Sequence, residues 1–290
     1  MKSLAIKKNK EHPFIYLLPA LAVLMMLVFI PLVTNIIRSF SVKGSFSLDN
    51  YKRLFSDTQF EKDLKNTFIW LLYTLPAEMV LGLLIAVLLN MKIKGQKFYR
   101  TLFIIPWVIP ATVVCVIWKW IYNADYGILN HILKSLGIVK NYQLWLANPS
   151  QSLACQALVY VWKISPFVMI MYLSGLQGIS SDIYEAADLD GANWFTQIFR
   201  ITIPLLFPVM RSVILVSTIW SLNSFVYVYS LTGGGPARVS ETIQILIYKT
   251  GIEQFKFEYS ATIANVFLVI VMIVACAYLI VSQKAEDNIE

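Results

Sequence analysis

Charged side chains are scarce in this sequence of 290 residues: Asp, Glu, Lys and Arg make up 14% of it, whereas hydrophobic residues make up 58%. With a mean hydropathy of +0.64, this balance excludes an ordinary soluble globular domain. Histidine is nearly absent, with only His12 and His131, and the three cysteines, Cys115, Cys155 and Cys276, show no CxxC spacing. We therefore expect no metal site, and we expect the cysteines to be small buried hydrophobic residues.

A phosphate-binding loop of the form G-x-x-x-x-G-K-[ST] is also missing from the sequence. The run Gly233-Gly234-Gly235-Pro236 lacks the lysine and the hydroxyl residue that such a loop needs. Within the apolar stretches there are no paired carboxylates and no nucleophile beside a base. We therefore predict that the chain is not an enzyme and binds no cofactor itself, so that any ATP must be bound by another chain.

Long apolar runs are what the sequence has in abundance. Six of them reach the length of about 20 residues that a helix needs to cross the hydrocarbon of a membrane. The alternating pattern of membrane β-strands is absent. The sequence therefore predicts an all-α polytopic membrane protein with six transmembrane helices, at Phe14–Ile37, Thr67–Asn90, Thr101–Tyr122, Leu153–Leu176, Ile203–Leu231 and Ala261–Ser282.

Basic residues near the ends of these runs predict the orientation, because cytoplasmic segments carry an excess of Lys and Arg. They cluster in the N-terminal tail and in the loop after the second run, at Lys2, Lys7, Lys8, Lys10, Lys92, Lys94, Lys97 and Arg100. We therefore expect both termini in the cytoplasm, and we attribute the net charge of +7 to topology and not to nucleic-acid binding. The expected parts are a cytoplasmic tail (1–13), a first helix with an external loop (14–62), a core of five helices (63–282) and a cytoplasmic tail (283–290).

A polar segment interrupts the apolar pattern between the fourth and fifth runs, with the sequence Glu185-Ala186-Ala187-Asp188-Leu189-Asp190-Gly191-Ala192. Asp182, with Glu185 three residues later, predicts a capped helix start, and Gly191 predicts its end. Asn193 is then placed to cap a second helix that runs toward Pro204. On these features alone, a simple connector between two spans explains the segment as well as a docking element does.

The segment EAADLDGANWFTQIFRITIPLLFP, from Glu185 to Pro208, resembles the EAA loop of binding-protein-dependent ABC importer permeases. The similarity extends over nearly the whole chain and points to the glycerol-3-phosphate, maltose and multiple-sugar permeases. The other segments that carry it are Tyr99–Phe103, Pro106–Pro110, Trp118–Tyr122, Tyr126–Asn130, Trp162–Met169 and Leu231–Thr242.

This resemblance implies a type I ABC importer permease in a bacterial cell membrane. The loop at about 181–204 would fit a groove in a dimeric cytoplasmic ATPase, which would use ATP and Mg²⁺. The residues that this implies for ATPase coupling are Glu185, Ala186, Ala187, Asp190, Gly191 and Ala192. A second homologous permease and an extracellular or periplasmic sugar-binding protein would complete the importer, and Gly233, Gly234, Gly235 and Pro236 would lie near the receptor. An ion-coupled secondary sugar carrier is the alternative, and Glu78 is its sole buried-carboxylate candidate.

Polar side chains within the spans are candidates for the sugar pathway, because such groups are costly in a membrane and usually functional. Lys163, beside Trp162 and Phe167, is one, although it could instead reach the outer interface. Asn223 and Tyr227, four residues apart and hence on one helical face, form the second group. Helix–helix hydrogen bonding is the alternative role for Asn223. The resemblance favours both regions for contact with the sugar. We expect an oligosaccharide of two to four units, with a raffinose-like α-galactoside as an example.

Overall fold

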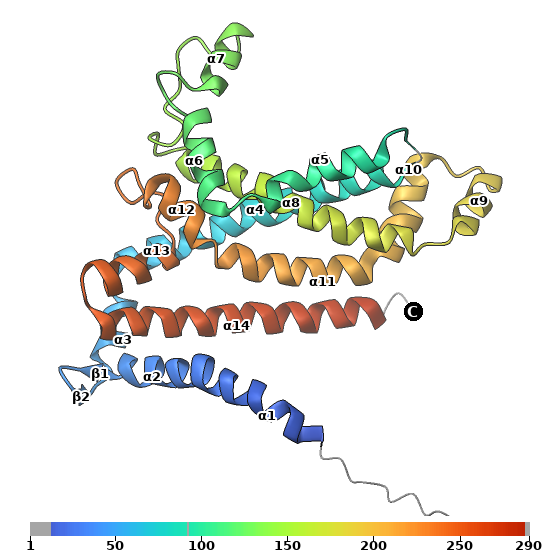
Figure 1. Cartoon of the computed structure of the whole chain (residues 1–290). Coiled ribbons are helices and arrows are strands. Elements are labelled where there is room, and N and C mark those ends of the chain that lie inside the picture. Colours follow the sequence, from blue (N-terminus) through green and yellow to red (C-terminus); the bar gives the residue numbers. More distant parts are fainter. Residues whose placement is uncertain (1–12, 92, 288–290) are drawn as a thin grey trace, which may run out of the picture.

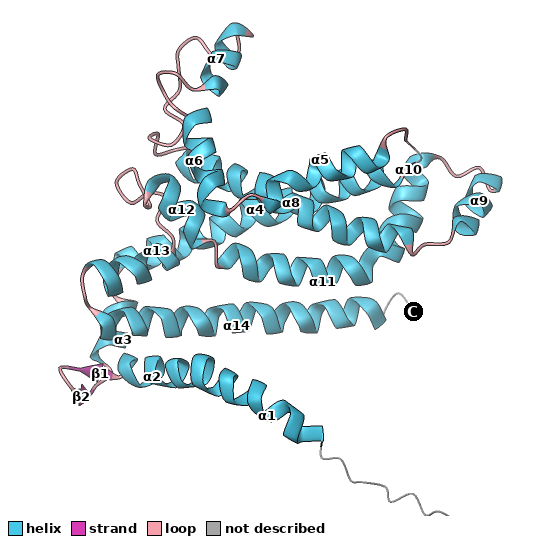
Figure 2. Ribbon diagram, viewed as in Figure 1, coloured by secondary structure: helices cyan, strands magenta, loops and turns pink. Residues whose placement is uncertain are grey.

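The computed structural model describes residues 13–91 and 93–287. Most of these residues form long helices that lie side by side in an elongated bundle, and the strands are confined to one short hairpin (Figures 1 and 2). The tail lysines, His12 and Lys92 lie outside the described residues. The first half of the chain forms α1 (Pro13–Leu24), η1 (Met25–Phe29), α2 (Ile30–Ser39), β1 (Ser41–Val42), β2 (Ser45–Phe46), α3 (Asp49–Phe55), α4 (Thr58–Asn90), α5 (Gln96–Val108), α6 (Ala111–Ile121) and α7 (Ile128–Ser135).

The second half begins with the long helix α8 and ends with the long helix α14. Between them, short helices precede and follow the longer apolar helix α11. The elements are α8 (Ser152–Gln177), α9 (Ser181–Leu189), α10 (Trp194–Gln197), η2 (Ile198–Thr202), α11 (Ile203–Leu222), α12 (Phe225–Thr232), α13 (Ile243–Tyr248), η3 (Lys249–Glu253) and α14 (Phe257–Asp287). In Figure 1, the start of α1, the end of α14 and α9 lie at one end of the bundle, and the β-hairpin and α13 lie at the other.

Among the described residues, five helical segments are long and apolar enough to cross a membrane, and a bent pair makes a sixth. This confirms the all-α polytopic prediction. The second segment is longer than expected: α4 begins at Thr58, where the Asp57 side chain accepts a hydrogen bond from the Gln59 N–H over 2.9 Å. Residue 63, where the core was expected to begin, therefore lies inside a helix.

The third predicted span is present as a sharply bent pair of helices. The run from Thr101 to Tyr122 consists of α5 and α6, which meet at an angle of 96°. Pro110 has no N–H to continue the helix, and it favours an extended backbone at Ile109, where φ is −65° and ψ is 133°. The bend therefore has a local cause that the proline already indicated.

The fifth run is also broken, because α11 ends at Leu222 and α12 starts at Phe225. Asn223 leaves the helical conformation (φ −103°, ψ 24°), and its side-chain Nδ2 donates a hydrogen bond to the Ile219 carbonyl over 2.9 Å. The expectation that Asn223 and Tyr227 share one helical face was therefore wrong. A side chain that competes for backbone carbonyls explains why the helix ends here.

Helices α4 and α8 form the most extensive interface of the bundle. They run in the same direction and approach most closely at Gly82, where an added Cβ would lie 2.5 Å from Cγ1 of Val168. Two buried apolar clusters extend from this contact, one around Trp70 and Tyr160 and the other around Met169 and Leu206. Small residues allow such close approach between membrane helices, which pack by van der Waals contact.

The cysteine prediction was correct in part. Cys115 is buried in the cluster around Trp70, and Cys155 is partly buried against it. Cys276, however, is exposed on α14. The prediction of burial was therefore wrong for Cys276. Only part of the surface of α14 packs against other helices, and Cys276 lies outside that part.

Replacing Gly82 with valine should force α4 and α8 apart. Overpacking of this kind costs about 1–3 kcal/mol, so the unfolding temperature of the purified protein should fall. Ala77→Val, at an exposed position of the same helix, is the control and should leave that temperature unchanged. Equal unfolding temperatures for the two variants would contradict the close contact.

Candidate functional site

Helix α9 contains the polar segment singled out in the sequence. Its N-cap is Ser180, whose hydroxyl accepts a hydrogen bond from the Asp182 N–H over 3.3 Å, so the assignment of the cap to Asp182 was wrong. Serine at this position has the extended backbone that a cap requires (φ −62°, ψ 138°). The true cap lies two residues before the predicted one. Asp182 is instead in the first turn, where the helix dipole favours a carboxylate.

The end of α9 agrees with the sequence prediction. Gly191 adopts a left-handed conformation with φ of +75°. The Gly191 N–H donates to the Asp188 carbonyl over 3.1 Å, and the Ala192 N–H donates to the Ala187 carbonyl over 2.9 Å. This pair of hydrogen bonds is a Schellman motif, which strongly favours glycine. Asn193 then caps α10, because its side-chain oxygen accepts from the Thr196 N–H over 2.9 Å.

The predicted coupling residues differ in exposure. Glu185, Ala186, Asp190 and Gly191 are exposed, Ala192 is half-buried, and Ala187 is buried. Ala187 therefore packs inward and does not face a partner.

Sequence reasoning missed several exposed apolar side chains beside α9. Leu189 is 91% exposed, and Trp194, Phe195 and Phe199 are also exposed. Large apolar residues inside a polar segment were the signal that could have found them. Exposed large apolar side chains of this kind mark contact with a membrane or with another protein.

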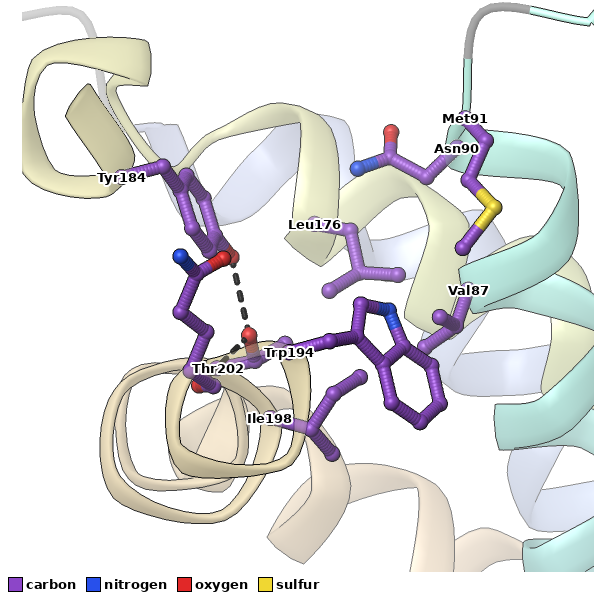
Figure 3. A pocket seen from close by; sticks show the side chains of 9 residues that line it. Val87, Asn90, Met91, Leu176, Tyr184, Trp194, Ile198 and Thr202 are labelled. Atoms are coloured by element: carbon purple, nitrogen blue, oxygen red, sulfur yellow. Dashed lines mark hydrogen bonds between the residues drawn. The ribbon is translucent and has the colours of Figure 1, made fainter. Parts of the chain in front are cut away.

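Helix α9 is fastened to the start of α11. The Tyr184 hydroxyl and the Thr202 hydroxyl lie 3.0 Å apart, and Gln197 Nε2 donates to both Asp188 and the Ala192 carbonyl. A pocket of about 240 Å³ separates this junction from the bundle, and Figure 3 shows the Trp194 indole within it, among Val87, Leu176 and Ile198. Hydrogen bonds therefore connect α9 to α10 and η2, and η2 continues into α11.

Lys163 is buried in α8, and its ammonium donates a hydrogen bond to the carbonyl of Trp107. Trp107 belongs to the last turn of α5, where carbonyls have no partner within their own helix. A cation is favoured at a helix C-terminus by the helix dipole. The structure therefore shows Lys163 reaching across to the bend between α5 and α6, and not to an interface.

Aromatic rings bring three helices together beside this bend. The ring of Phe167 lies 6.0 Å from Trp107 and 4.6 Å from Trp220, between centroids, and Trp107 and Trp220 are each 38% exposed. Trp162 instead contacts Trp118 at 5.7 Å. The sequence indicated Phe167 and Trp162 but not the two tryptophans that meet Phe167, because they come from distant segments.

The second predicted pathway group is divided by the break in the fifth run. Asn223 is exposed at the break, near the C-terminal end of the helix that carries Trp220. Tyr227 is buried in the core, where its ring lies edge-on to Tyr160 at 5.0 Å. Of the two, only Asn223 is accessible from outside the chain.

The glycine-rich loop at the opposite end of the bundle is held firmly. Gly233 ends α12 with φ of +63°, a left-handed conformation that favours glycine. The Gly235 carbonyl accepts hydrogen bonds from the hydroxyls of Ser152, over 3.1 Å, and Ser240. The segment Gly233–Pro236 is buried or half-buried, and the exposed residues of the loop are Ala237, Arg238 and Val239.

Ion pairs complete the anchoring of this loop. Glu241 is fully buried and binds Arg238 through two hydrogen bonds of 2.9 and 2.7 Å, and Lys249 through one of 2.9 Å. The hydrogen bonds to the Glu241 carboxylate raise the pKa of Arg238 above its ordinary value. Asn66 on α4 donates to the carbonyls of Val239 and Glu241. The loop is therefore held against the first part of α4.

The model of a protein family described as "Binding-protein-dependent transport system inner membrane component" matches residues 78–287. A probable ABC transporter permease protein of Pyrococcus horikoshii is 31% identical over 98% of this chain and 100% of its own length. The trehalose/maltose transport system permease protein of Thermococcus litoralis is 33% identical over 81% of each chain.

Among solved structures, a chain of a bacterial ABC transporter involved in the import of the acidic polysaccharide alginate superimposes with a TM-score of 0.86. The match covers 94% of this chain and 95% of that chain, at 20% sequence identity. At this identity the match demonstrates a shared fold.

Replacing Lys163 with methionine should destabilise the bend between α5 and α6. The change leaves the Trp107 carbonyl without its partner, which costs about 1–3 kcal/mol, so we expect a lower unfolding temperature. Lys119→Met, which removes an exposed lysine of α6, is the control. An unchanged unfolding temperature in Lys163→Met would contradict a capping role for Lys163.

Proposed function

Since the chain belongs to the family of binding-protein-dependent transport system inner membrane components, we propose that it forms half of the translocation pathway of an ATP-driven sugar importer. The observation that carries the proposal is the exposed helix α9, closed by a Schellman motif and fastened to α11. Relatives named for the transport of trehalose and maltose, and of sulfoquinovosyl glycerol, support a sugar as the substrate class. The likeness to a chain of an alginate importer supports the same fold at nearly full length.

The partner at α9 is a cytoplasmic ATPase subunit. The chain has no phosphate-binding loop, so ATP and Mg²⁺ are used by that subunit. Its groove would take the exposed residues Glu185, Ala186, Asp190 and Leu189, with Glu185 paired to a basic side chain. Ala187, Gly191 and Ala192 contribute indirectly, because they build the cap that fixes the direction of α9.

Closure of the ATPase would then move the membrane helices through a short path. The hydroxyl contact between Tyr184 and Thr202 and the amide contacts of Gln197 connect α9 to η2 and α11. Helix α11 ends at Leu222, two residues after Trp220. A two-state bundle whose equilibrium is biased at both ends is what such coupling requires.

The remaining partners follow from the same architecture. One α9 per chain calls for a second permease, because a dimeric ATPase presents two grooves. A sugar-binding protein outside the cell would dock at the end that carries the Gly233–Thr242 loop, with Arg238 and Val239 accessible to it. A neighbouring solved structure holds an alginate transporter with a periplasmic protein bound to an alginate pentasaccharide, which shows this assembly for that transporter. The setting is a bacterial plasma membrane, with both termini in the cytoplasm.

The sugar would pass the accessible rings of Trp107 and Trp220, which meet on Phe167, and the amide of Asn223. Aromatic faces suit the apolar faces of a sugar ring, and an amide offers both a donor and an acceptor to hydroxyls. Trp162 extends the aromatic surface toward Trp118. Lys163 and Tyr227 do not line the pathway but support it. Lys163 binds the Trp107 carbonyl, and Tyr227 packs in the buried core. An oligosaccharide of two to four units, such as a raffinose-like α-galactoside, fits this scheme.

Reversing the charge of Glu185 should uncouple transport. In Glu185→Lys, a lysine would face the basic groove of the ATPase, and like charges across an interface cost several kcal/mol, so uptake should fall at least about tenfold. The measurement is uptake by the reconstituted importer, together with recovery of the ATPase on an affinity-tagged permease.

Asp125→Lys makes the same charge change at an exposed position between α6 and α7. It should transport at the normal rate. Normal uptake by Glu185→Lys with its ATPase bound would refute the assignment of α9 as the coupling helix.

Replacing Asn223 with leucine should change the kinetics of sugar transport and leave the assembly intact. The variant removes the accessible amide, and the loss of one hydrogen bond of about 1 kcal/mol predicts a severalfold increase in the sugar concentration for half-maximal uptake. Thr218→Val, a polar position of α11 that bonds only to the carbonyl four residues earlier, is the control. Unaltered uptake kinetics in Asn223→Leu would exclude Asn223 from the pathway.

A further inference from the structure

Glu78 is a carboxylate in the interior of the bundle that the transport scheme does not use. Helix α4 extends from Thr58 to Asn90 and places Glu78 well inside the helix. Its side chain is fully buried, and neither carboxylate oxygen has a hydrogen-bond partner among the described residues. An ionised carboxylate in such a place costs several kcal/mol unless a cation or hydrogen bonds compensate it.

Glu78 belongs to a polar layer between α4, α8 and α11. Trp70, Thr74 and Glu78 follow one another at four-residue intervals on α4, hence along one face. The Trp70 Nε1, the Tyr160 hydroxyl and the Ser217 hydroxyl in this region are also buried without a hydrogen-bond partner. Native proteins leave few such groups unpaired, so several together call for an explanation.

The register between α4 and α11 identifies the group opposite Glu78. The hydroxyls of Thr74 and Ser221 lie 2.6 Å apart, and the two helices run in opposite directions (Figure 1). One turn further along α4 is Glu78, and one turn earlier along α11 is Ser217. A carboxylic acid and a hydroxyl can satisfy each other in such a place, whereas a carboxylate and a hydroxyl leave a net charge in the interior.

Among the described residues, no cation pairs with the Glu78 carboxyl group. The titratable side chains of α8 near Glu78 are Tyr160 and Tyr172, whose hydroxyls are uncharged at neutral pH. The ammonium of Lys163, also on α8, is bound to the Trp107 carbonyl. The arginine of α11, Arg211, lies six residues beyond Ser217 toward α9 and makes an interaction of its own. In the described part of the chain, no cluster of three metal-binding side chains includes Glu78.

We propose that Glu78 is a proton-binding site: it holds one proton as a neutral carboxylic acid that faces Ser217 while α4, α8 and α11 are packed together. The ligand is a proton and not a metal ion, because the layer offers hydroxyls and an indole but too few oxygens to surround a cation. Parting of the three helices would expose the acid to water and release the proton. The site does not depend on which substrate the chain transports.

The first test is infrared spectroscopy of the full importer in lipid nanodiscs, which resolves the carbonyl band of a protonated carboxyl group. Labelling of glutamate with ¹³C assigns the band to Glu and not to Asp. We expect a protonated glutamate band at neutral pH in the wild-type protein, its loss in Glu78→Gln, and its retention in Glu61→Gln, which removes an exposed carboxyl of the same helix. If no protonated glutamate is seen in the wild-type protein, or if Glu78→Gln retains the band, the proposal is wrong.

Sodium titration at fixed pH separates a proton from a cation. A band that appears only when Na⁺ is removed would mean that a carboxylate binds the metal ion, and would overturn the proposal. A band that is independent of Na⁺ supports it. Both readings come from the wild-type protein, so the test stands even if Glu78→Gln does not assemble.

Stability against pH gives an independent measurement. A glutamate exposed on unfolding ionises with an ordinary pKa, so unfolding would release one proton at neutral pH, and stability would fall as the pH rises. The effect is a tenfold decrease in the folding equilibrium constant for each pH unit. We expect this decline in the wild-type protein and in Glu61→Gln, and a decline shallower by one proton in Glu78→Gln. Parallel profiles for all three proteins would contradict the proposal.

Discussion

Backbone groups that leave a helix inside a membrane bundle must find partners within the protein, because hydrocarbon offers none. The structure is organised around places where this requirement is met by side chains from other segments. The carbonyl of Trp107, freed by the bend at Pro110, is bound by the ammonium of Lys163. The carbonyl of Gly235, beyond the end of α12, is bound by the hydroxyls of Ser152 and Ser240. Without such partners, the carbonyls at the bend between α5 and α6 and in the turn after α12 would be left unpaired, which is costly away from water.

The breaks matter because they bring polar groups and aromatic rings to one place in the bundle. Phe167 contacts Trp107 beside the first break and Trp220 just before the second. In a continuous helix, the backbone groups bond to one another and the side chains point in all directions around the axis. Interrupted helices at the centre of a bundle are a common feature of transport sites for this reason. Here, one of the interrupted helices, α11, is also the one fastened to α9.

Features with local causes could be predicted from the sequence. Gly191 and Asn193 specified the end of α9 and the start of α10, because a left-handed glycine and a capping amide act within a few residues. Pro110 indicates the bend, because a proline cannot continue the hydrogen bonding of a helix. The apolar composition around it predicts a span but not the bend. The long-range contacts could not be predicted. Lys163 and Trp107 are 56 residues apart, and Thr74 and Ser221 are 147 apart. No pattern in a single sequence specifies such pairs.

The charged and polar side chains of the bundle interior therefore fall into two kinds. Lys163 binds the Trp107 carbonyl, which is free because α5 ends at the bend. The dipole of α5 favours a positive charge at this helix end. Glu78 lies in an unbroken stretch of α4, where every backbone N–H is already used and no helix end is near. A carboxylate would need N–H donors or a cation, and this stretch supplies neither, so a proton is the remaining means of satisfying the group. A buried charge needs a compensating partner. Lys163 has one in the helix end of α5, whereas Glu78 has none and therefore holds a proton in our proposal.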